Sequence, residues 1–515
     1  MLGLSMDSAN LGGADPRLLM ATGAIFMTYL GFKLIGPKRR RPGPYPSGPT
    51  GLPIVGNLFQ LGKNPHLKFM EWSKKYGKVF SIKLGVHDVI VINGWKAYRQ
   101  ALIYQADSFA GRPNFYTFRN IICDGKTLAF NTYSDRFKQH KKILVEGLKT
   151  FLQSNDPPID QAVLDEAKLM VKHLQNNGEP IEPYTPLLNS CLFVICGLIF
   201  GYESDLCKDR AKVNAIGNVD ETRDAEGAGS NVVDFFPFIR PLLMGTLKGM
   251  LEECNTRMAM IRQLEKEHRE TYDENALRDL MDHLIKASDN MNADQKKAGL
   301  TSDHIMSTAF TLLNAGSDTL AGMLYWASLY AANYPEVQEK IIAEIDEVIG
   351  GDRMPSVEDR PHLPYTEAFL NEVMRYCVLT PFLIPHAATR DVKYMGYTIP
   401  EGTVVFCNMW SVSRDDEVWP DPNAFRPERW MDDEGRLNKS SFDNFYPFSA
   451  GKRRCIGESM ARMEFMMFFV TVMQNCRIVN VSENPPDMTG NFGFSMLPNQ
   501  FKVLYEKRRE ASWEQ

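Results

Sequence analysis

The sequence has no strong excess of charge of either sign and no pair of cysteines at the CxxC spacing. Its 515 residues carry 58 Lys and Arg against 63 Asp and Glu, a formal net charge of −5. Such a balance excludes the general electrostatic attraction to nucleic acid that a basic protein would have. The nine cysteines are scattered along the chain, which is typical of a reducing compartment rather than of a disulfide framework.

Two further features are missing. The sequence contains no Gly-x-Gly-x-x-Gly fingerprint for a dinucleotide and no evident flavin site, so it gives no sign of a nicotinamide or flavin domain of its own. After residue 50 there is no linker rich in Pro, Gly or Ser, and no internal repeat, although the length alone would favour two or three domains. An apolar content of 44% is ample for a core.

One cysteine lies in a sequence that stands out from the rest. Residues 448–457 read Phe-Ser-Ala-Gly-Lys-Arg-Arg-Cys-Ile-Gly, with Cys455 behind a glycine turn and beside three cations. An apolar helical pattern follows from Gly457 to about Gln474. Cations and a helix N-terminus both lower the pKa of a cysteine, so we expect a thiolate here. A single thiolate suits haem iron; the alternative is a free cysteine buried at the start of a helix.

This stretch resembles the haem-binding loop of the cytochrome P450 superfamily, Phe-x-x-Gly-x-Arg-x-Cys-x-Gly, at all five fixed positions. The resemblance implies one large domain with the fold of that superfamily, mainly α with small β-sheets, and haem b as the cofactor. It implies that Cys455 is the axial ligand of the haem iron and that Arg453 pairs with a propionate. Phe448 would pack beside the loop, Gly451 would give the turn its backbone angles, and Gly457 would let the helix approach the porphyrin.

A second motif lies in an apolar helix predicted over Ser302–Asn333. Gly316 and the adjacent Asp318-Thr319 pair are poor choices for its interior, and Thr319 can hydrogen-bond the carbonyl of Ala315 and bend the helix. The pattern is similar to the superfamily's oxygen-activation segment. That resemblance implies that Thr319 assists oxygen activation, that Asp318 relays protons, and that Ala315 and Gly316 lie against the cofactor. The alternative is a helix packed on its neighbour through the glycine.

A charged pair, Glu372 and Arg375, lies one helical turn apart among apolar residues. Such a pair is ordinarily a surface contact, but these neighbours indicate a largely buried helix. In the superfamily an arginine of a later Pro-Glu-Arg segment, here Arg429, joins the pair. The resemblance therefore implies a structural cluster of the three residues, whose loss would strand a buried charge and prevent haem insertion.

Two more residues are assigned to the haem propionates by resemblance. His386 stands where similar proteins have a histidine that donates to a propionate; the alternative is a hydrogen-bonded turn histidine. Many superfamily members carry Trp-x-x-x-Arg in an early helix, where this chain has Phe137 and Lys141. Phenylalanine has no indole donor, and lysine offers a point charge in place of a bidentate fork. Propionate binding by Lys141 is therefore expected to be weaker.

Lysines recur along that early helix, and further cations adjoin the cysteine loop. If both segments lie on the thiolate side of the haem, they form a positive patch for an acidic electron-donor protein; the alternative is an ordinary solvated helix face. The resemblance implies an NADPH-dependent cytochrome P450 reductase as the donor, with cytochrome b5 as a second candidate partner. The cations concerned are Lys138, Lys141, Lys142, Lys149, Lys452, Arg453 and Arg454.

Aromatic residues cluster in segments that line the substrate pocket of the superfamily. Flat rings on several walls favour a planar, hydrophobic ligand; the alternative for each residue is ordinary core packing. From Asn314 onward the chain is most similar to the aryl-hydrocarbon hydroxylases of family 1 and to neighbouring steroid hydroxylases, which implies an aromatic or steroid-like substrate. The expected lining residues are Phe115, Phe118, Phe236, Phe310, Asn314, Phe382 and Phe494.

The N-terminal region predicts a single transmembrane helix. Residues 18–35 carry one charge and would span roughly 27 Å as a helix, just enough for a bilayer core. Four basic residues follow directly, so the positive-inside rule places the rest of the chain in the cytosol; the alternative is a cleaved signal peptide. We expect a luminal leader and anchor over 1–36, a basic, proline-rich hinge over 37–50 and the catalytic domain over 51–515, at the endoplasmic reticulum membrane.

Periodicity predicts the other elements. Strands are expected over 81–92, as a pair about a turn, and over 392–398 and 403–408. Helices are expected over 336–349 and 366–377. Mobile loops are expected over 217–231 and 287–301, and a solvated tail over 507–515.

Together these features predict a membrane-anchored monooxygenase that uses O2 and electrons from the reductase to oxidise a hydrophobic small molecule. Two alternatives remain open. A haem-thiolate isomerase or dehydratase would need no reductase, and the Asp318-Thr319 pair argues against it. A non-catalytic haem-binding or sensor protein would keep the cysteine loop without needing a proton relay.

Overall fold

The structure is a computed structural model that describes residues 43–152, 159–217, 232–482 and 487–509. The predicted leader, the membrane anchor and the first part of the hinge lie outside these ranges. Within the described residues, no helix is long and apolar enough to cross a membrane.

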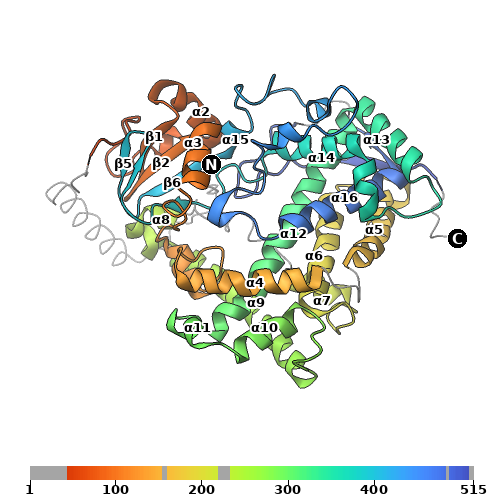
Figure 1. Cartoon of the computed structure of the whole chain (residues 1–515), viewed down its shortest axis with the longest axis horizontal. Coiled ribbons are helices and arrows are strands. Elements are labelled where there is room, and N and C mark those ends of the chain that lie inside the picture. Colours follow the sequence, from red (N-terminus) through yellow and green to blue (C-terminus); the bar gives the residue numbers. More distant parts are fainter. Residues whose placement is uncertain (1–42, 153–158, 218–231, 483–486, 510–515) are drawn as a thin grey trace.

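The described chain is mainly helical (Figure 1). Short helical turns join the longer helices, among them η6 (Cys123–Gly125), η10 (Pro427–Trp430) and η12 (Gly451–Arg453). The α-helices are α2 (Pro65–Tyr76), α3 (Trp95–Arg99), α4 (Asp135–Leu152), α5 (Ile159–Gln175), α6 (Tyr184–Phe200), α7 (Arg210–Gly217), α8 (Val232–Phe235), α9 (Met244–Glu270), α10 (Leu280–Asp289), α11 (Ala293–Lys297), α12 (Ser302–Asn333), α13 (Pro335–Val348), α14 (Pro364–Cys377), α15 (Met409–Val412) and α16 (Glu458–Asn475).

Three small sheets complete the fold. The largest has the strand order β1-β2-β6-β3, in which β2 and β6 are parallel and the other neighbours are antiparallel. In Figure 1 this sheet lies with α2 and α3 on one side of the molecule, and most helices lie on the other side. The strands are β1 (Val79–Leu84), β2 (His87–Asn93), β3 (His386–Ala387), β4 (Val392–Tyr394), β5 (Tyr397–Ile399), β6 (Val404–Asn408), β7 (Cys476–Asn480) and β8 (Val503–Lys507).

Helix α12 runs through the middle of the molecule and packs along α6 (Figure 1). Helix α6 is apolar on nearly all sides, as expected for a helix enclosed by others. The two helices approach closely at Gly316, where an added Cβ would lie only 3.0 Å from Cδ1 of Ile195. Gly316 therefore packs against α6, and its predicted position against the cofactor stays a prediction.

Most predicted elements are confirmed. The strand pair over 81–92 is present as β1 and β2, and the helices expected over 302–333, 336–349 and 366–377 are α12, α13 and α14. The strand predicted over 392–398 is instead a hairpin of β4 and β5, because Gly396 turns the chain with φ of 84°.

Two predictions of irregular structure are wrong in part. The segment 287–301 contains the end of α10 and all of α11, and α11 starts with a capping box between Asn292 and Gln295. The tail predicted from residue 507 is ordered at its start, because Arg508 donates to the carbonyls of Met473 and Gln474. The loop expected over 217–231 lies almost entirely outside the described residues.

Glu464 is a carboxyl group buried in the interior, on the core side of α16, with only 3% of its surface exposed. Its Oε1 has no hydrogen-bond partner among the described residues. Desolvation raises the pKa of Glu464 from 4.5 to about 8. The residue is therefore a neutral acid in the core at neutral pH.

Glu464 predicts a pH dependence of stability. Between pH 4.5 and about 8 the folded chain holds a proton that the unfolded chain has released, so stability falls as the pH rises through this window. Glu464→Gln should remove this loss and be more stable than the wild type by a few kcal/mol at pH 8.5, but not at pH 5. Urea titrations at the two pH values measure the difference in the free energy of unfolding between the variant and the wild type. An equal difference at both pH values would contradict the raised pKa of Glu464.

Candidate functional site

The cysteine loop places one thiol where a ligand can reach it. All nine cysteines lie in the described ranges, and among them only Cys455 is exposed. The loop needs a glycine at position 451, because its φ is 68° and an added Cβ would lie 1.9 Å from the carbonyl oxygen of Leu102. The backbone N–H of Cys455 donates to the carbonyl of Phe448 at 2.9 Å, which closes the loop.

The pKa of the Cys455 thiol is higher than the sequence predicts. Surrounding protein atoms desolvate the thiol and raise its pKa above 9.0, and the hydrogen bond from the backbone of Gly457 and the charge of Arg454 offset this only in part. The helix N-terminus and the cations therefore do not make a thiolate by themselves. Coordination of a metal ion is the remaining influence that would do so.

Two arginines beside the loop, the buried Arg112 and the partly buried Arg453, have no acidic partner among the described residues. Arg453 donates to the carbonyls of Ala110 and Asn131 at 2.8 and 2.6 Å. Arg112 donates three hydrogen bonds, all to backbone carbonyls. Within the described part of the chain, neither guanidinium pairs with a carboxylate. Burial lowers the pKa of Arg453 to about 9, and burial together with the charge of Arg453 lowers the pKa of Arg112 well below its usual value.

This pair of cations fits the haem that the cysteine loop implies. Buried charges are normally paired, because an isolated charge in the interior is costly. Haem carries two propionates, and two adjacent guanidinium groups would bind them with charge-assisted hydrogen bonds. The residues present therefore suit haem in two respects. The thiol can bind iron, and the two guanidinium groups can pair with the propionates.

The departure from the Trp-x-x-x-Arg pattern has a local explanation. The ring of Phe137 lies under the Arg453 guanidinium, with the carbon of the guanidinium 3.9 Å from the ring centre. Phe137 thus supports Arg453 instead of donating a hydrogen bond itself. Lys141 donates from Nζ to the carbonyl of Lys452 at 3.1 Å, so its contact with a propionate stays a prediction.

His386 is buried in β3 and its Nδ1 lies 2.7 Å from the carbonyl oxygen of Phe109. A carbonyl only accepts, so Nδ1 carries the proton. Burial and the charge of Arg112 lower the pKa of His386 well below 6.5, which keeps the ring neutral. Its Nε2 is then an acceptor, and the predicted donation to a propionate requires a second proton on the ring.

The oxygen-activation segment forms an open face on an otherwise buried helix. Ala315 is exposed in the middle of α12, and Thr319, one turn later, is partly exposed. Thr319 donates from Oγ1 to the carbonyl of Ala315 at 2.8 Å, as predicted. Asp318 accepts a hydrogen bond of 2.6 Å from the hydroxyl of Tyr184 on α6. Here the open face of α12 means Thr311, Leu312, Asn314, Ala315, Asp318 and Thr319.

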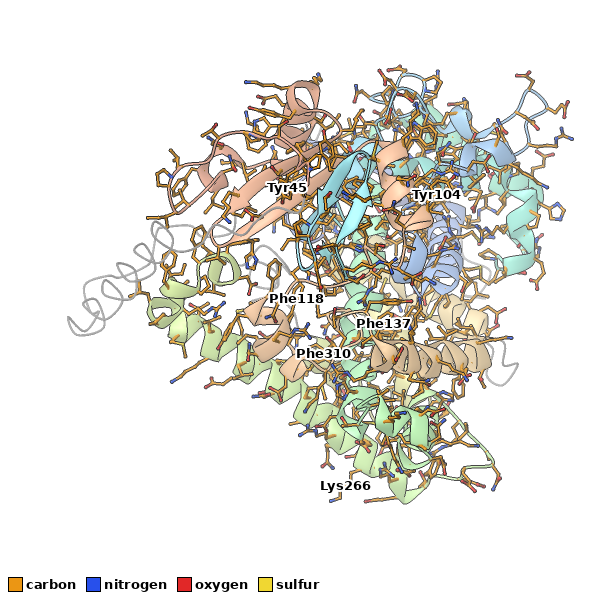
Figure 2. All side chains as sticks on the ribbon, turned by 60° about the vertical axis from the view of Figure 1, so that its left-hand side comes forward. Tyr45, Tyr104, Phe118, Phe137, Lys266 and Phe310 are labelled. Carbon is orange, nitrogen blue, oxygen red and sulfur yellow. The ribbon has the colours of Figure 1, made fainter. Side chains whose placement is uncertain are left out.

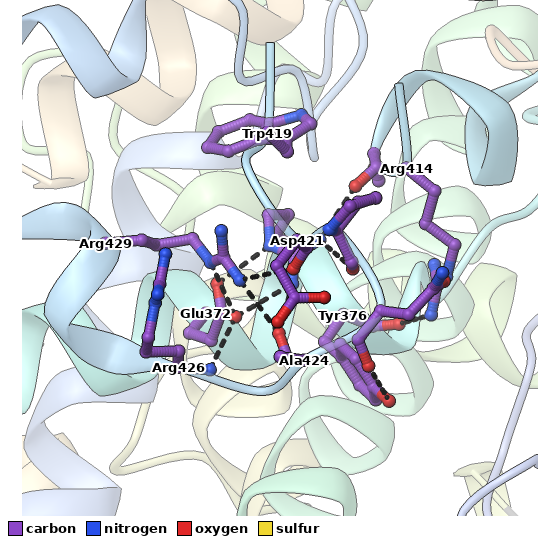
Figure 3. A network of polar contacts seen from close by, with 12 residues as sticks. Glu372, Tyr376, Arg414, Trp419, Asp421, Ala424, Arg426 and Arg429 are labelled. Atoms are coloured by element: carbon purple, nitrogen blue, oxygen red, sulfur yellow. Dashed lines mark hydrogen bonds and ion pairs between the residues drawn. The ribbon is translucent and has the colours of Figure 1, made fainter. Parts of the chain in front are cut away.

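The predicted structural cluster is present and is larger than expected (Figure 3). Glu372 and Arg375 are fully buried, and each carboxylate oxygen of Glu372 accepts from the Arg375 guanidinium at 2.8 Å. Arg429 donates from Nε to Glu372 at 2.9 Å. The indole of Trp430 and the backbone N–H of Arg426 also donate to Glu372. Five donor groups therefore hold one carboxylate.

The predicted substrate residues lie in several parts of the fold. Phe115, Phe118 and Phe236 belong to one buried cluster, with Phe382 packed against it. Phe310 lies in the main helical core, in a different cluster from Phe118, and Figure 2 labels both side chains. Asn314 is held by an arginine of α9. Phe494 is partly buried in the C-terminal segment.

Sequence reasoning missed three residues at the site. Arg112 could have been suspected, because it is a lone cation in the apolar stretch Phe109–Phe115. Tyr184 and Arg257 gave no such signal, since their partners on α12 are more than 50 residues away in sequence.

Comparisons with known proteins agree with this site. The sequence model of the family described as Cytochrome P450 matches residues 46–505. Cytochrome P450 1A1 of Sparus aurata is 36% identical over 469 residues, which covers 87% of this chain and 88% of the relative. Cytochrome P450 1A5 of Gallus gallus is 34% identical over 516 residues, with 96% and 97% covered. Cytochrome P450 1A1 of Limanda limanda is 36% identical over 473 residues, with 89% of each chain covered.

Proposed function

The chain belongs to the cytochrome P450 family and is a haem monooxygenase similar to family 1, and from that premise we propose that it inserts one oxygen atom of O2 into planar aromatic or steroid-like substrates. The observation that carries the site assignment is the exposed Cys455 thiol beside Arg112, which is buried, and Arg453, which is partly buried, two cations that no carboxylate pairs with among the described residues. When bound, haem b supplies the activation of O2 and the transfer of oxygen to the substrate.

The proposed roles of the haem-binding residues follow from their surroundings. Cys455 would bind the iron, and Arg112 and Arg453 would hold the propionates, with Lys141 and His386 at the edge of that set. The small residues Ala315, Gly451 and Gly457 and the ring of Phe448 would shape the loop and helix faces next to the cofactor.

The experiment that tests the function measures NADPH oxidation by the purified protein with a purified cytochrome P450 reductase. We expect consumption that depends on both O2 and a hydrophobic substrate and that yields a product with one added oxygen atom. A haem-thiolate isomerase would convert substrate without reductase, and a sensor protein would bind ligand without turnover. Either result would contradict the proposal.

Proton control is proposed for Asp318 and Thr319. The Thr319 hydroxyl donates to the Ala315 carbonyl, so its oxygen lone pairs remain as acceptors on the open face of α12. Asp318, held by Tyr184, would pass protons from water toward this hydroxyl.

Thr319→Ala tests this assignment. Without the hydroxyl, the delivery of protons is no longer directed by Thr319. Part of the reduced oxygen should then be released as hydrogen peroxide. We expect the ratio of product to NADPH to fall several-fold and peroxide to rise, with substrate affinity nearly unchanged. Thr319→Ser, which keeps the hydroxyl, is the matched control. Unchanged coupling in the alanine variant would remove Thr319 from proton delivery.

The electron donor is proposed to bind the lysines of α4 and the cysteine loop. The hydrogen bond between Lys141 and the carbonyl of Lys452 brings these two segments side by side. Lys138 and Lys142 pair with Asp135 and Glu146, but their side chains are 54% and 67% exposed. Exposed ion pairs of this kind are weak, so both lysines can exchange them for an acidic partner. NADPH–cytochrome P450 reductase is the proposed donor, and cytochrome b5 is a second candidate for the same surface.

Charge reversal should weaken this docking. We expect Lys138→Glu with Lys142→Glu to raise the apparent KM for reductase about tenfold at low salt, and less at high salt because ions screen the attraction. Lys297→Glu, a charge reversal at an exposed position of α11, is the control. Equal reductase affinity of the double variant and the wild type would contradict the proposed surface.

The membrane location also remains a proposal. Residues 18–35 would anchor the protein in the endoplasmic reticulum membrane, with the catalytic domain in the cytosol. Protease added to intact microsomes should then digest the catalytic domain. Protection of that domain would contradict the topology.

A further inference from the structure

An arginine of α9 reaches an asparagine on the open face of α12. Arg257 is 6% exposed and donates from Nη1 to Oδ1 of Asn314 at 3.0 Å. The same guanidinium pairs with Glu253, one turn earlier on α9, at 2.5 Å. Glu253 offsets the charge of Arg257, and Asn314 gives it a neutral acceptor in the interior.

These contacts fix the orientation of the amide. The oxygen of Asn314 must face Arg257, because a guanidinium has donors and no acceptor. The nitrogen, Nδ2, donates one hydrogen to the carbonyl of Phe310 at 3.0 Å. The two bonds therefore fix the positions of Oδ1 and Nδ2 in the amide of Asn314. No acceptor among the described residues meets the second hydrogen of Nδ2.

The position of Asn314 allows that second N–H to donate to a ligand. Asn314 is partly exposed at one edge of the open face of α12, directly before the exposed Ala315. Its neighbours one turn away are Phe310, which is 6% exposed, and Asp318. An oriented N–H donor next to the apolar side chains of Phe310 and Ala315 can select and orient a hydrophobic molecule that carries an acceptor.

We propose that Asn314, held by Arg257, selects substrates that carry a neutral hydrogen-bond acceptor, a carbonyl or hydroxyl oxygen, on a flat hydrophobic body. The inference rests on the proposed function and narrows it toward oxygenated ring systems and away from unsubstituted hydrocarbons. Arg257 is a positioning residue, since it acts by fixing the amide. Because Glu253 already offsets its charge, an anionic ligand is not favoured.

Three molecules with one carbon skeleton test the proposal: fluorene, 9-fluorenone and 9-fluorenol. Their dissociation constants are measured on the full-length ferric protein by the spin-state change and by equilibrium dialysis. Asn314→Asp keeps an acceptor for Arg257 but removes both N–H groups. We expect it to lower the preference for fluorenone over fluorene about tenfold, the effect of one well-placed hydrogen bond. Fluorenol, which can donate to a carboxylate, should lose less affinity than fluorenone.

Arg257→Leu should lower the same ratio, because the amide then keeps only its bond to the Phe310 carbonyl and is held less firmly, while the affinity for fluorene stays within about twofold. Arg262→Leu, a change on the same helix at a side chain that is 59% exposed, should leave the ratio unchanged.

Binding of the ligands with an unchanged ratio in both Asn314→Asp and Arg257→Leu would overturn the inference and leave the proposed function intact. An equal loss for all three ligands would show a purely structural role and also overturn it. A wild-type protein that neither binds nor oxidises any of the three would contradict the proposed function, and the inference with it.

Discussion

Replacing Glu372 by glutamine is expected to lower the free energy of unfolding by about 3–5 kcal/mol, the usual result of removing one partner of a buried ion pair. The carboxylate is fully buried and balances two arginines, Arg375 and Arg429, whose side chains are 0% and 3% exposed. Without its negative charge, both guanidinium groups remain buried without a counter-charge. A loss of this size is a large fraction of the stability of a typical domain, so little haem-loaded protein should accumulate.

Denaturant titration and the haem-to-protein ratio after purification measure this effect. Glu339→Gln is the matched control, because Glu339 pairs with Arg477 in an ion pair that is about half exposed. Exposed pairs contribute little, so the control should change stability by less than about 1 kcal/mol. Normal stability and haem content of Glu372→Gln would show that the cluster is not essential to the fold.

Replacing Arg453 or Arg112 by leucine is expected to have a small effect on the stability of the haem-free protein and a large effect on haem binding. Each arginine is a buried or partly buried charge that no carboxylate balances among the described residues, so its loss should not destabilise the haem-free chain by the amount expected for a broken ion pair. In the loaded protein each variant would lose a charge-assisted bond to a propionate. We expect haem to dissociate about 10 to 100 times faster.

Transfer of haem to a protein scavenger measures the dissociation rate. Arg436→Leu, at a side chain that is 70% exposed, is the control and should dissociate at the wild-type rate. Unchanged dissociation rates in both Arg453→Leu and Arg112→Leu would contradict the assignment of these cations to the propionates.

The parts of the site that the sequence predicted are those built from local patterns. The loop around Cys455, the helix that carries Asp318 and Thr319, and the Glu372-Arg375 pair each lie within about ten residues. Fixed spacing on a turn or a helix determines how such residues meet. The family resemblance added Arg429, which the structure places on Glu372 as expected.

The parts that the sequence did not predict depend on burial and on distant contacts. The thiol pKa of Cys455 is raised because desolvation outweighs the nearby cations, a balance that only the packed chain determines. The tautomer of His386 depends on a carbonyl 277 positions away in the chain. The pairing of Arg257 with Asn314 joins two helices that are far apart in sequence. The helical turns within 287–301 were not predicted because their polar composition is typical of a loop.

Binding of the Cys455 sulfur to haem iron is the central claim, and the absorption spectrum of the reduced protein under carbon monoxide tests it most directly. We expect a strongly red-shifted Soret band for the wild type, the signature of an anionic sulfur ligand that donates electron density to iron. Cys455→His should bind haem without that shift. An intact, haem-loaded wild-type protein that lacks the shifted band would contradict the account.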